Sequence, residues 1–212
     1  MTLTFSDALG EMPLVAILRG ITPDEVEAIG DALIESGLRL IEVPLNSPSP
    51  FDSIARLAAH VKGRAIVGAG TVIRKDEVER VGAAGGQLIV SPHIDVELIR
   101  FAAARGHDIL PGIATLSEAM AALQAGASAL KLFPAETIGP AWVKAARAVL
   151  PTRTAVLPVG GIEPQSVSAW VAAGAAGFGL GSGLFRPGMS ALEVKERALS
   201  YVEAWRAAGE TT

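Results

Sequence analysis

The sequence predicts an α/β protein in which eight parallel strands alternate with helices and close into a (β/α)8 barrel. Short, almost continuously apolar segments recur along the chain, which is typical of strands buried on both faces of a parallel sheet. Signals for helix starts and stops lie between these segments, and parallel strands need such crossover connections. The 212 residues allow roughly 25 for each strand–helix unit, near the lower size limit of a TIM barrel.

The eight expected strands share a core of apolar or β-branched residues. They span residues 14–18, 40–44, 65–69, 87–91, 108–110, 129–133, 155–159 and 177–180. An open doubly wound sheet is the alternative arrangement, but it would place a glycine-rich dinucleotide turn after the first strand. Residues 19–23, Arg-Gly-Ile-Thr-Pro, do not form such a turn.

The expected helices carry recognisable boundary residues. Thr22 is an expected N-cap, followed by Pro23 and acidic residues in the first turn of a helix that runs to Ser36 before Gly37. The same pattern predicts helices within residues 74–85, 116–126 and 163–174. Residues 2–12 are expected to form a short extra helix over the bottom of the barrel. No change in composition marks a linker, so residues 1–212 are expected to form one domain.

The composition narrows the possible functions. Half of the residues are hydrophobic, the net charge is -4 and there is no cysteine. These values argue against nucleic acid and anionic membranes as partners, and they exclude disulfides and thiolate chemistry. The three histidines lie far apart in sequence, so no protein-bound metal and no cofactor are expected. The first residues lack the pattern of a signal peptide, and we therefore expect a cytoplasmic protein.

Lys131 interrupts the apolar segment 129–134. An ammonium in a poorly hydrated strand has a lowered pKa, and the neutral amine is a nucleophile that attacks carbonyl groups to form Schiff bases. The alternative is a lysine whose stem packs while its tip reaches water.

Glu42 is a second charged residue inside an expected strand, residues 40–44. A carboxylate close to Lys131 would transfer protons while a carbinolamine forms and loses water. The alternative is a structural ion pair between Glu42 and Lys131.

Glycine turns follow the seventh and eighth strands, where barrels commonly bind phosphate through backbone N–H groups. The candidate residues are Gly160, Gly161, Gly181 and Ser182. Glycine allows the backbone to approach an anion closely. Ordinary tight turns are the alternative.

Other candidates also lie at the carboxyl ends of strands. Arg19 is expected to bind a carboxylate or phosphate, unless it is merely a surface residue. Thr71 would hydrogen-bond the substrate, although residues 68–71 also suit a close-packed turn. Phe133, on the same strand face as Lys131, would form a wall of the pocket, with ordinary core packing as the alternative. His93 is expected to cap a helix, with substrate contact as the alternative.

Six of these segments together resemble the class I aldolases of 2-keto-3-deoxy-6-phosphosugar acids. The matching motifs, spread from about residue 13 to about residue 187, are at residues 15–20, 42–48, 68–72, 131–135, 159–162 and 179–182. The resemblance implies reversible cleavage to pyruvate and D-glyceraldehyde 3-phosphate by a homotrimeric barrel. It also implies that Lys131 forms the Schiff base, that Glu42 is the general acid/base, and that Arg19 and Thr71 contact the keto-acid end. Gly160, Gly161, Gly181 and Ser182 would bind the phosphate.

Members of this family differ in whether they act on the gluconate or the galactonate epimer, which differ at C4. Residues 46–48, Asn-Ser-Pro, and Val159 resemble the galactonate branch. Two other functions remain open at this point. One is a phosphosugar isomerase or epimerase in which Glu42 is the base. The other is a phosphometabolite sensor without catalytic activity.

Overall fold

Parallel strands joined by helices form the protein, as the sequence predicts. The computed structural model describes residues 3–209. Its strands are β1 (Leu14–Ile17), β2 (Leu40–Pro44), β3 (Ile66–Gly70), β4 (Leu88–Val90), β5 (Asp108–Leu110), β6 (Gly112–Ile113), β7 (Leu130–Leu132), β8 (Val156–Pro158) and β9 (Phe178–Leu180). Each of the eight predicted segments contains a strand. The fifth continues as β6 after Pro111, which lacks the N–H group that a continuous ladder needs.

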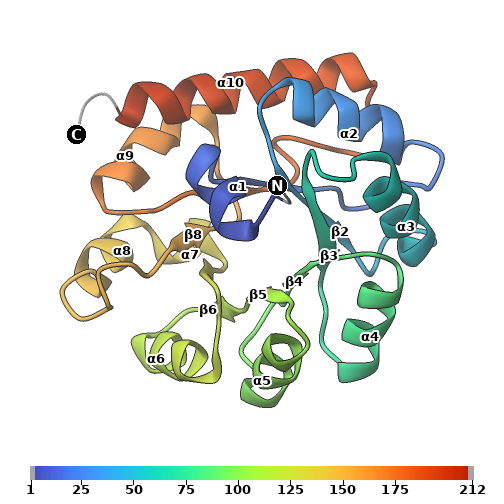
Figure 1. Ribbon diagram of the computed structural model, residues 1–212. Helices are drawn as coiled ribbons and strands as arrows, with labels where there is room; N and C mark the ends of the chain where they lie inside the picture. Colours follow the sequence, from blue (N-terminus) through green and yellow to red (C-terminus); the bar gives the residue numbers. More distant parts are fainter. Residues whose placement is uncertain (1–2, 210–212) are drawn as a thin grey trace.

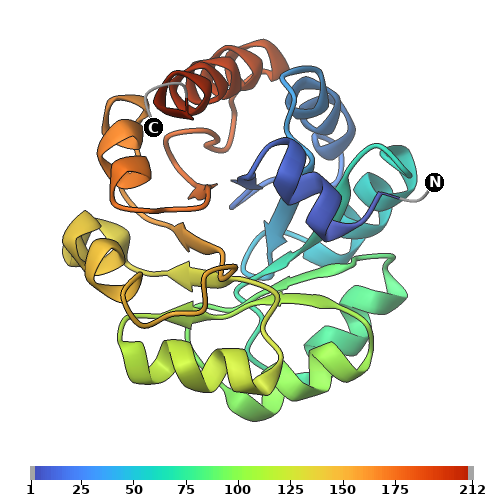
Figure 2. The same ribbon diagram turned by 60° about the vertical axis from the view of Figure 1, so that its left-hand side comes forward.

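The strands form a curled parallel sheet that resembles a TIM barrel. One part has the order β5-β4-β3-β2-β1-β9 and the other the order β6-β7-β8. The Lys131 N–H donates to the Pro111 carbonyl, at a distance of 3.0 Å, where the two parts adjoin. On the opposite side, Val159 forms a parallel bridge with Gly179. Figure 2 shows the helices arranged around the strands.

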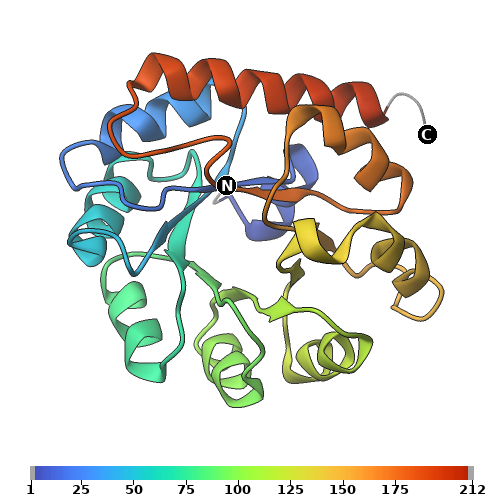
Figure 3. The ribbon, with the colours of Figure 1, turned by 180° about the vertical axis from the view of Figure 1, so that it is seen from behind.

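Helices lie on the outside of this sheet. They are α1 (Phe5–Glu11), α2 (Val26–Glu35), α3 (Pro50–His60), α4 (Lys75–Ala83), α5 (Val96–Ala104), α6 (Leu116–Ala125), α7 (Ala135–Ile138), α8 (Pro140–Ala146), the 3-10 turn η1 (Pro164–Ser166), α9 (Val167–Ala172) and α10 (Ala191–Gly209). The long α10 packs against α2 and α9 (Figures 1 and 3). Its contact with α2 brings segments near the two ends of the chain together.

Two of the predicted helices begin later than expected. Helix α2 begins at Val26, and the residues before it form a turn in which Thr22 Oγ1 donates to Glu25 Oε2 over 2.5 Å. Thr22 is therefore not the N-cap, because its hydroxyl bonds to a side chain and not to a free helix N–H. The segment after Glu163 first forms η1 and becomes an α-helix only at Val167.

Helix α1 covers the end of the sheet at which the strands begin. Its Phe5 and Ala8 are buried against inward-facing residues of the strands, among them Val15, Leu40 and Ile66. This confirms the predicted N-terminal helix, although residue 2 lies outside the described range. A larger apolar core fills the space between the strands and the outer helices.

The alternation of side chains along each strand brings the two predicted charged residues into the interior. Leu40 belongs to the interior core, and Glu42 follows it by two residues on β2. Ala129 belongs to the same core, and Lys131 follows it by two residues. Residues two apart on a strand share a face, so both charged side chains point inward. Among residues 3–209, no helix is long and apolar enough to cross a membrane.

Candidate active site

Lys131 is buried among apolar side chains in the middle of β7. Only 7% of the residue is exposed. Burial lowers the pKa of the Lys131 ammonium, because loss of hydration disfavours the charged form. The positive charge of Arg19 lowers this pKa further, whereas the negative charge of Glu42 opposes the shift. Burial therefore shifts Lys131 toward the neutral amine, as the nucleophile hypothesis requires.

Glu42 is more deeply buried than Lys131, with 1% exposure. Burial raises the pKa of the Glu42 carboxyl to about 7, and the charges of Lys131 and Arg19 limit the rise. The Glu42 Oε2 atom has no hydrogen-bond partner. Glu42 and Lys131 line the same small interior cavity of about 10 Å³. Within residues 3–209 they form no ion pair, so the structural-bridge interpretation does not hold.

Gly70, at the end of β3, leaves the space that the Glu42 carboxyl group occupies. A Cβ atom on Gly70 would overlap Glu42 Oε2. The pairing of β2 with β3 sets this contact, because Pro44 lies opposite Gly70 and Glu42 opposite Gly68. Gly70 therefore has a role that the sequence did not reveal: it makes room for a buried carboxyl group.

A larger cavity of about 460 Å³ opens at the carboxyl ends of the strands, where the sequence predicts the site. Lys131 lines this cavity as well as the small interior one. Phe133 lies just beyond β7, with its ring centroid 4.8 Å from Lys131 Nζ and 38% of the residue exposed. Thr71 also lines the cavity and has a φ of 59°, a left-handed conformation that is uncommon for threonine.

Arg19 lies at the rim of the cavity and is held there by the loop after β2. Its Nη1 atom donates to Asn46 Oδ1 over 2.6 Å. The N–H of the next residue, Gly20, donates to Ser47 Oγ over 2.9 Å. Arg19 is thus exposed, as the alternative interpretation has it, and still faces the cavity that contains Lys131. Residues 46–47, noted in the sequence only for their resemblance to one branch of a family, orient it.

The glycine turns after β8 and β9 lie on the same cavity. Gly160 and Gly161 have φ angles of 107° and 64°, which residues with side chains rarely adopt. Five backbone N–H groups in these turns donate to no other group in residues 3–209; they belong to Gly161, Ile162, Gly181, Ser182 and Gly183. Unpaired N–H groups around a cavity suit an anion.

The structure adds Arg186 to the predicted residues. Arg186 lines the cavity, and its Nε atom donates to the Ser182 carbonyl over 2.9 Å. No sequence pattern singled it out, because it lies in a loop after β9. The prediction for His93 was wrong: Asp95 caps α5 by accepting from the N–H groups of Glu97 and Leu98. The His93 side chain is not among those that line the cavity.

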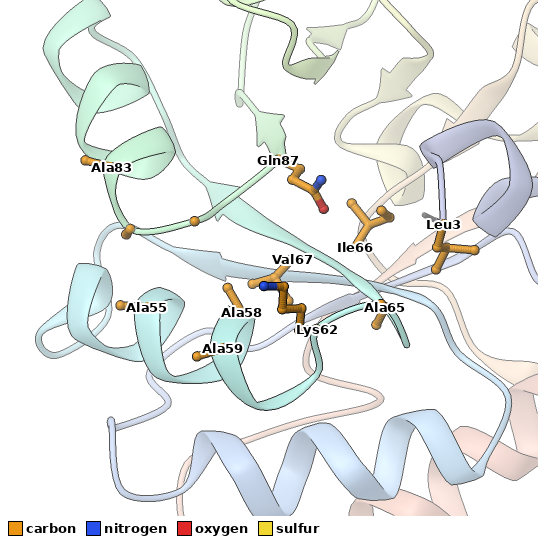
Figure 4. A pocket seen from close by; sticks show the side chains of 13 residues that line it. Leu3, Ala55, Ala58, Ala59, Lys62, Ala65, Ile66, Val67, Ala83 and Gln87 are labelled. Carbon is orange, nitrogen blue, oxygen red and sulfur yellow. The ribbon is translucent and has the colours of Figure 1, made fainter. Parts of the chain in front are cut away.

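A second cavity of similar volume, about 450 Å³, lies between α3 and α4 and carries little reactive chemistry (Figure 4). Alanine and other small or apolar residues form most of its wall, and Lys62 is the charged side chain among the residues that line it. In the described part of the chain, no group of three or more His, Asp or Glu residues is arranged to hold a metal ion. The cavity at Lys131 is therefore the candidate site.

Comparisons with known proteins identify the family of this chain. Residues 5–199 match the family described as KDPG and KHG aldolase. The 2-dehydro-3-deoxy-6-phosphogalactonate aldolase of Escherichia coli (strain K12) is 46% identical over 198 residues, which cover 93% of this chain and 97% of that protein. A solved structure of native KDPGal has a TM-score of 0.93 at 44% identity, covering 99% of this chain and all of that one, 100%. A designed cube-shaped cage, made by fusing symmetric oligomeric domains, also has a TM-score of 0.93, with 45% identity over 95% of this chain and 74% of its own.

The buried Glu42 carboxyl predicts a specific dependence of stability on pH. Its pKa of about 7 in the folded protein exceeds the ordinary value of 4.5, so between these values the folded state binds more protons than the unfolded state. The free energy of unfolding should therefore fall as pH rises through this window. In Glu42→Gln this contribution should disappear. Urea unfolding at pH 5 and pH 8 is the measurement. The exposed Glu203→Gln variant is the control and should keep the wild-type difference in unfolding free energy between pH 5 and pH 8. The same difference in Glu42→Gln would contradict the prediction.

Proposed function

Since this chain belongs to the family of KDPG and KHG aldolases, we propose that it cleaves 2-dehydro-3-deoxy-6-phospho-D-galactonate to pyruvate and D-glyceraldehyde 3-phosphate, reversibly and through a Schiff base. The observation that carries the proposal is the pair of buried groups in the sheet interior. Lys131 has a lowered pKa and faces the cavity, and Glu42 lies below it with a raised pKa.

Lys131 is the nucleophile in this proposal. Its neutral amine attacks the C2 carbonyl carbon of the keto acid and forms a carbinolamine. Loss of one water molecule then gives a protonated imine. Apolar surroundings support the attack, because they favour the uncharged amine. Phe133, against the amine, limits the access of water to it.

Glu42 moves the protons. As a carboxylate it removes the proton from the C4 hydroxyl group, the C3–C4 bond breaks, and its electron pair moves to the imine to give an enamine. Glyceraldehyde 3-phosphate leaves as the aldehyde. Protonation of C3 restores an imine, and the water molecule released earlier is consumed again when hydrolysis frees pyruvate and Lys131. A pKa of about 7 suits this role, since the carboxyl group exchanges protons in both directions near neutral pH.

The two ends of the substrate are anionic and match the two ends of the cavity. Arg19, oriented by Asn46, binds the carboxylate of the keto acid, and Thr71 hydrogen-bonds the same end. The phosphate lies at the glycine turns formed by Gly160, Gly161, Gly181 and Ser182. Unpaired N–H groups in these turns and the charge of Arg186 support this placement. Side chains and water supply every nucleophile and proton that the reaction needs, and we propose no cofactor.

The wider properties of the protein follow the same proposal. We infer one domain, residues 1–212, whose sheet closes as a (β/α)8 barrel through the contact between Val159 and Gly179. An experimental structure with β8 and β9 apart would contradict closure. We place the reaction in the cytoplasm, in keeping with the lack of cysteine. Neither nucleic acid nor a membrane is a proposed partner.

Lys131→Met should abolish activity. Methionine keeps the length and apolar stem but has no amine, so borohydride with pyruvate should fix no adduct and cleavage should fall to background, a loss of about 10⁴-fold or more. Mass spectrometry of the reduced protein and a coupled pyruvate assay are the measurements. Lys62→Met, in the cavity between α3 and α4, is the matched control and should keep both activities.

Substantial activity that survives treatment with borohydride and pyruvate would instead favour a phosphosugar isomerase or epimerase in which Glu42 is the base. Wild-type protein that binds a phosphosugar acid but neither cleaves it nor traps pyruvate would favour a sensor.

The galactonate epimer is the proposed substrate, and the gluconate epimer is the alternative. Val159 lines the cavity and offers shape but no hydrogen bond, whereas threonine at this position resembles the gluconate branch. Val159→Thr should shift the ratio of the two kcat/KM values toward gluconate by about 10-fold. Cleavage kinetics on both epimers measure this ratio. A wild-type enzyme that prefers gluconate would refute the assignment.

A homotrimer is the expected assembly. The family resemblance implies it, and the similar designed cage was made from symmetric oligomeric domains. Light scattering should give about three times the chain mass of 21.8 kDa. A monomer that stays stable across the concentration range would contradict this expectation.

A further inference from the structure

Helix α10 hydrogen-bonds both glycine turns through two side chains that do not line the cavity at Lys131. Tyr201, which is 2% exposed, donates from its hydroxyl group to the Ile162 carbonyl over 2.8 Å. One turn earlier on the same helix, Arg197 Nη1 donates to the Gly183 carbonyl over 3.0 Å. One helix therefore contacts the turn after β8 and the turn after β9, two segments that are separate in the sequence.

We propose that Tyr201 and Arg197 are positioning residues for phosphate binding: they hold the two glycine turns so that their free N–H groups face the cavity. This inference rests on the proposed aldolase function and deepens it. Neither residue lines the cavity at Lys131, so both act through the backbone.

Tyr201 and Arg197 each fix the peptide group that directly follows a free donor, the Ile162 N–H in the first turn and the Gly183 N–H in the second. A carbonyl and the N–H that follows it belong to one plane and point in opposite directions. The Ile162–Glu163 peptide is fixed at both ends, since Tyr201 binds its carbonyl and the Glu163 N–H donates to Ser166 Oγ over 3.2 Å. In the second turn, the Ser182 carbonyl accepts from Arg186, and the Gly183 N–H of the same peptide is free.

Glycine turns need such support because glycine is the most flexible residue. Without it, binding of phosphate would include the entropic cost of ordering both turns. Bonds from a rigid helix order the turns before the substrate arrives. Loss of these bonds should therefore weaken the binding of phosphate and leave the chemistry at Lys131 unchanged.

Gly183 shows how tightly the helix and the turn fit. A Cβ atom at this position would overlap the Tyr201 hydroxyl oxygen, and the Tyr201 Cζ atom would lie 3.4 Å away. The Tyr201 hydroxyl oxygen, and not the ring, therefore leaves no room for a side chain at position 183. Burial also raises the pKa of Tyr201 to about 12, so the hydroxyl group remains a donor at neutral pH.

Tyr201→Phe tests the proposal, because it removes the hydroxyl group and keeps the ring. We expect KM for the phosphorylated substrate and the inhibition constant of inorganic phosphate to rise together, by about 5- to 10-fold. We expect kcat and the rate of borohydride trapping with pyruvate, which has no phosphate, to stay within about twofold. Ser200→Ala is the control on the same helix, because the Ser200 hydroxyl donates to the Glu196 carbonyl and not to the turns.

A mutant cycle gives an independent test. Gly183→Ala should raise KM in the wild-type background, because the methyl group displaces the Tyr201 hydroxyl. The same change should have a smaller effect in Tyr201→Phe, where the overlapping atom is absent. Arg197→Met should raise KM in the same way as Tyr201→Phe.

The outcomes are distinct. Unchanged KM and unchanged phosphate inhibition in Tyr201→Phe would overturn the proposal. A fall in the rate of pyruvate trapping as large as the rise in KM would also overturn it, because it would indicate general damage to the fold. Additive effects in the cycle would also count against it. Wild-type protein that neither cleaves substrate nor traps pyruvate would refute the proposed function itself.

Discussion

The burial of Lys131 and Glu42 in the apolar interior of the sheet is the constraint on which the rest of the site depends. Each group loses hydration, and in residues 3–209 neither gains an ion pair in return. The attraction between their opposite charges offsets only part of this lost hydration, and burial of the apolar cores on both sides of the strands offsets the remaining cost. Burial lowers the pKa of the Lys131 ammonium and raises that of the Glu42 carboxyl to about 7, shifts that neither group would show in water.

Several features of the fold serve this arrangement. Strand periodicity directs both side chains inward, and Gly70 leaves the volume that the carboxyl group fills. Arg19 stays at the rim, where its charge acts on both groups without entering the interior. The Asn46 amide holds the guanidinium there, so the loop after β2 contributes to the site although it is remote from Lys131 in sequence.

Chemistry and recognition occupy different parts of the molecule. The reactive groups lie on strands, whose positions the sheet determines, whereas the proposed phosphate site lies on loops made of flexible residues. Loops of this kind need external support, and α10 supplies it through Tyr201 and Arg197. The same helix packs against α2 and α9. The last helix of the chain thus links the stability of the fold to the geometry of the cavity.

The sequence by itself determined the strand segments, the N-terminal helix and the identity of the buried pair, because hydrophobic runs and charges within them are local properties of a chain. Lys131, Glu42 and the glycine turns were all predictable on this basis. Thr22 and His93 were assigned as helix caps incorrectly. The N-cap positions are Glu25 and Asp95, and they depend on where each helix begins in three dimensions. Arg186, the Arg19–Asn46 bond, the space at Gly70 and the contacts of Tyr201 emerged only in the tertiary structure. Each joins residues that are distant in sequence or lie in loops without a pattern, and only the packing of strands and helices decides which of them meet.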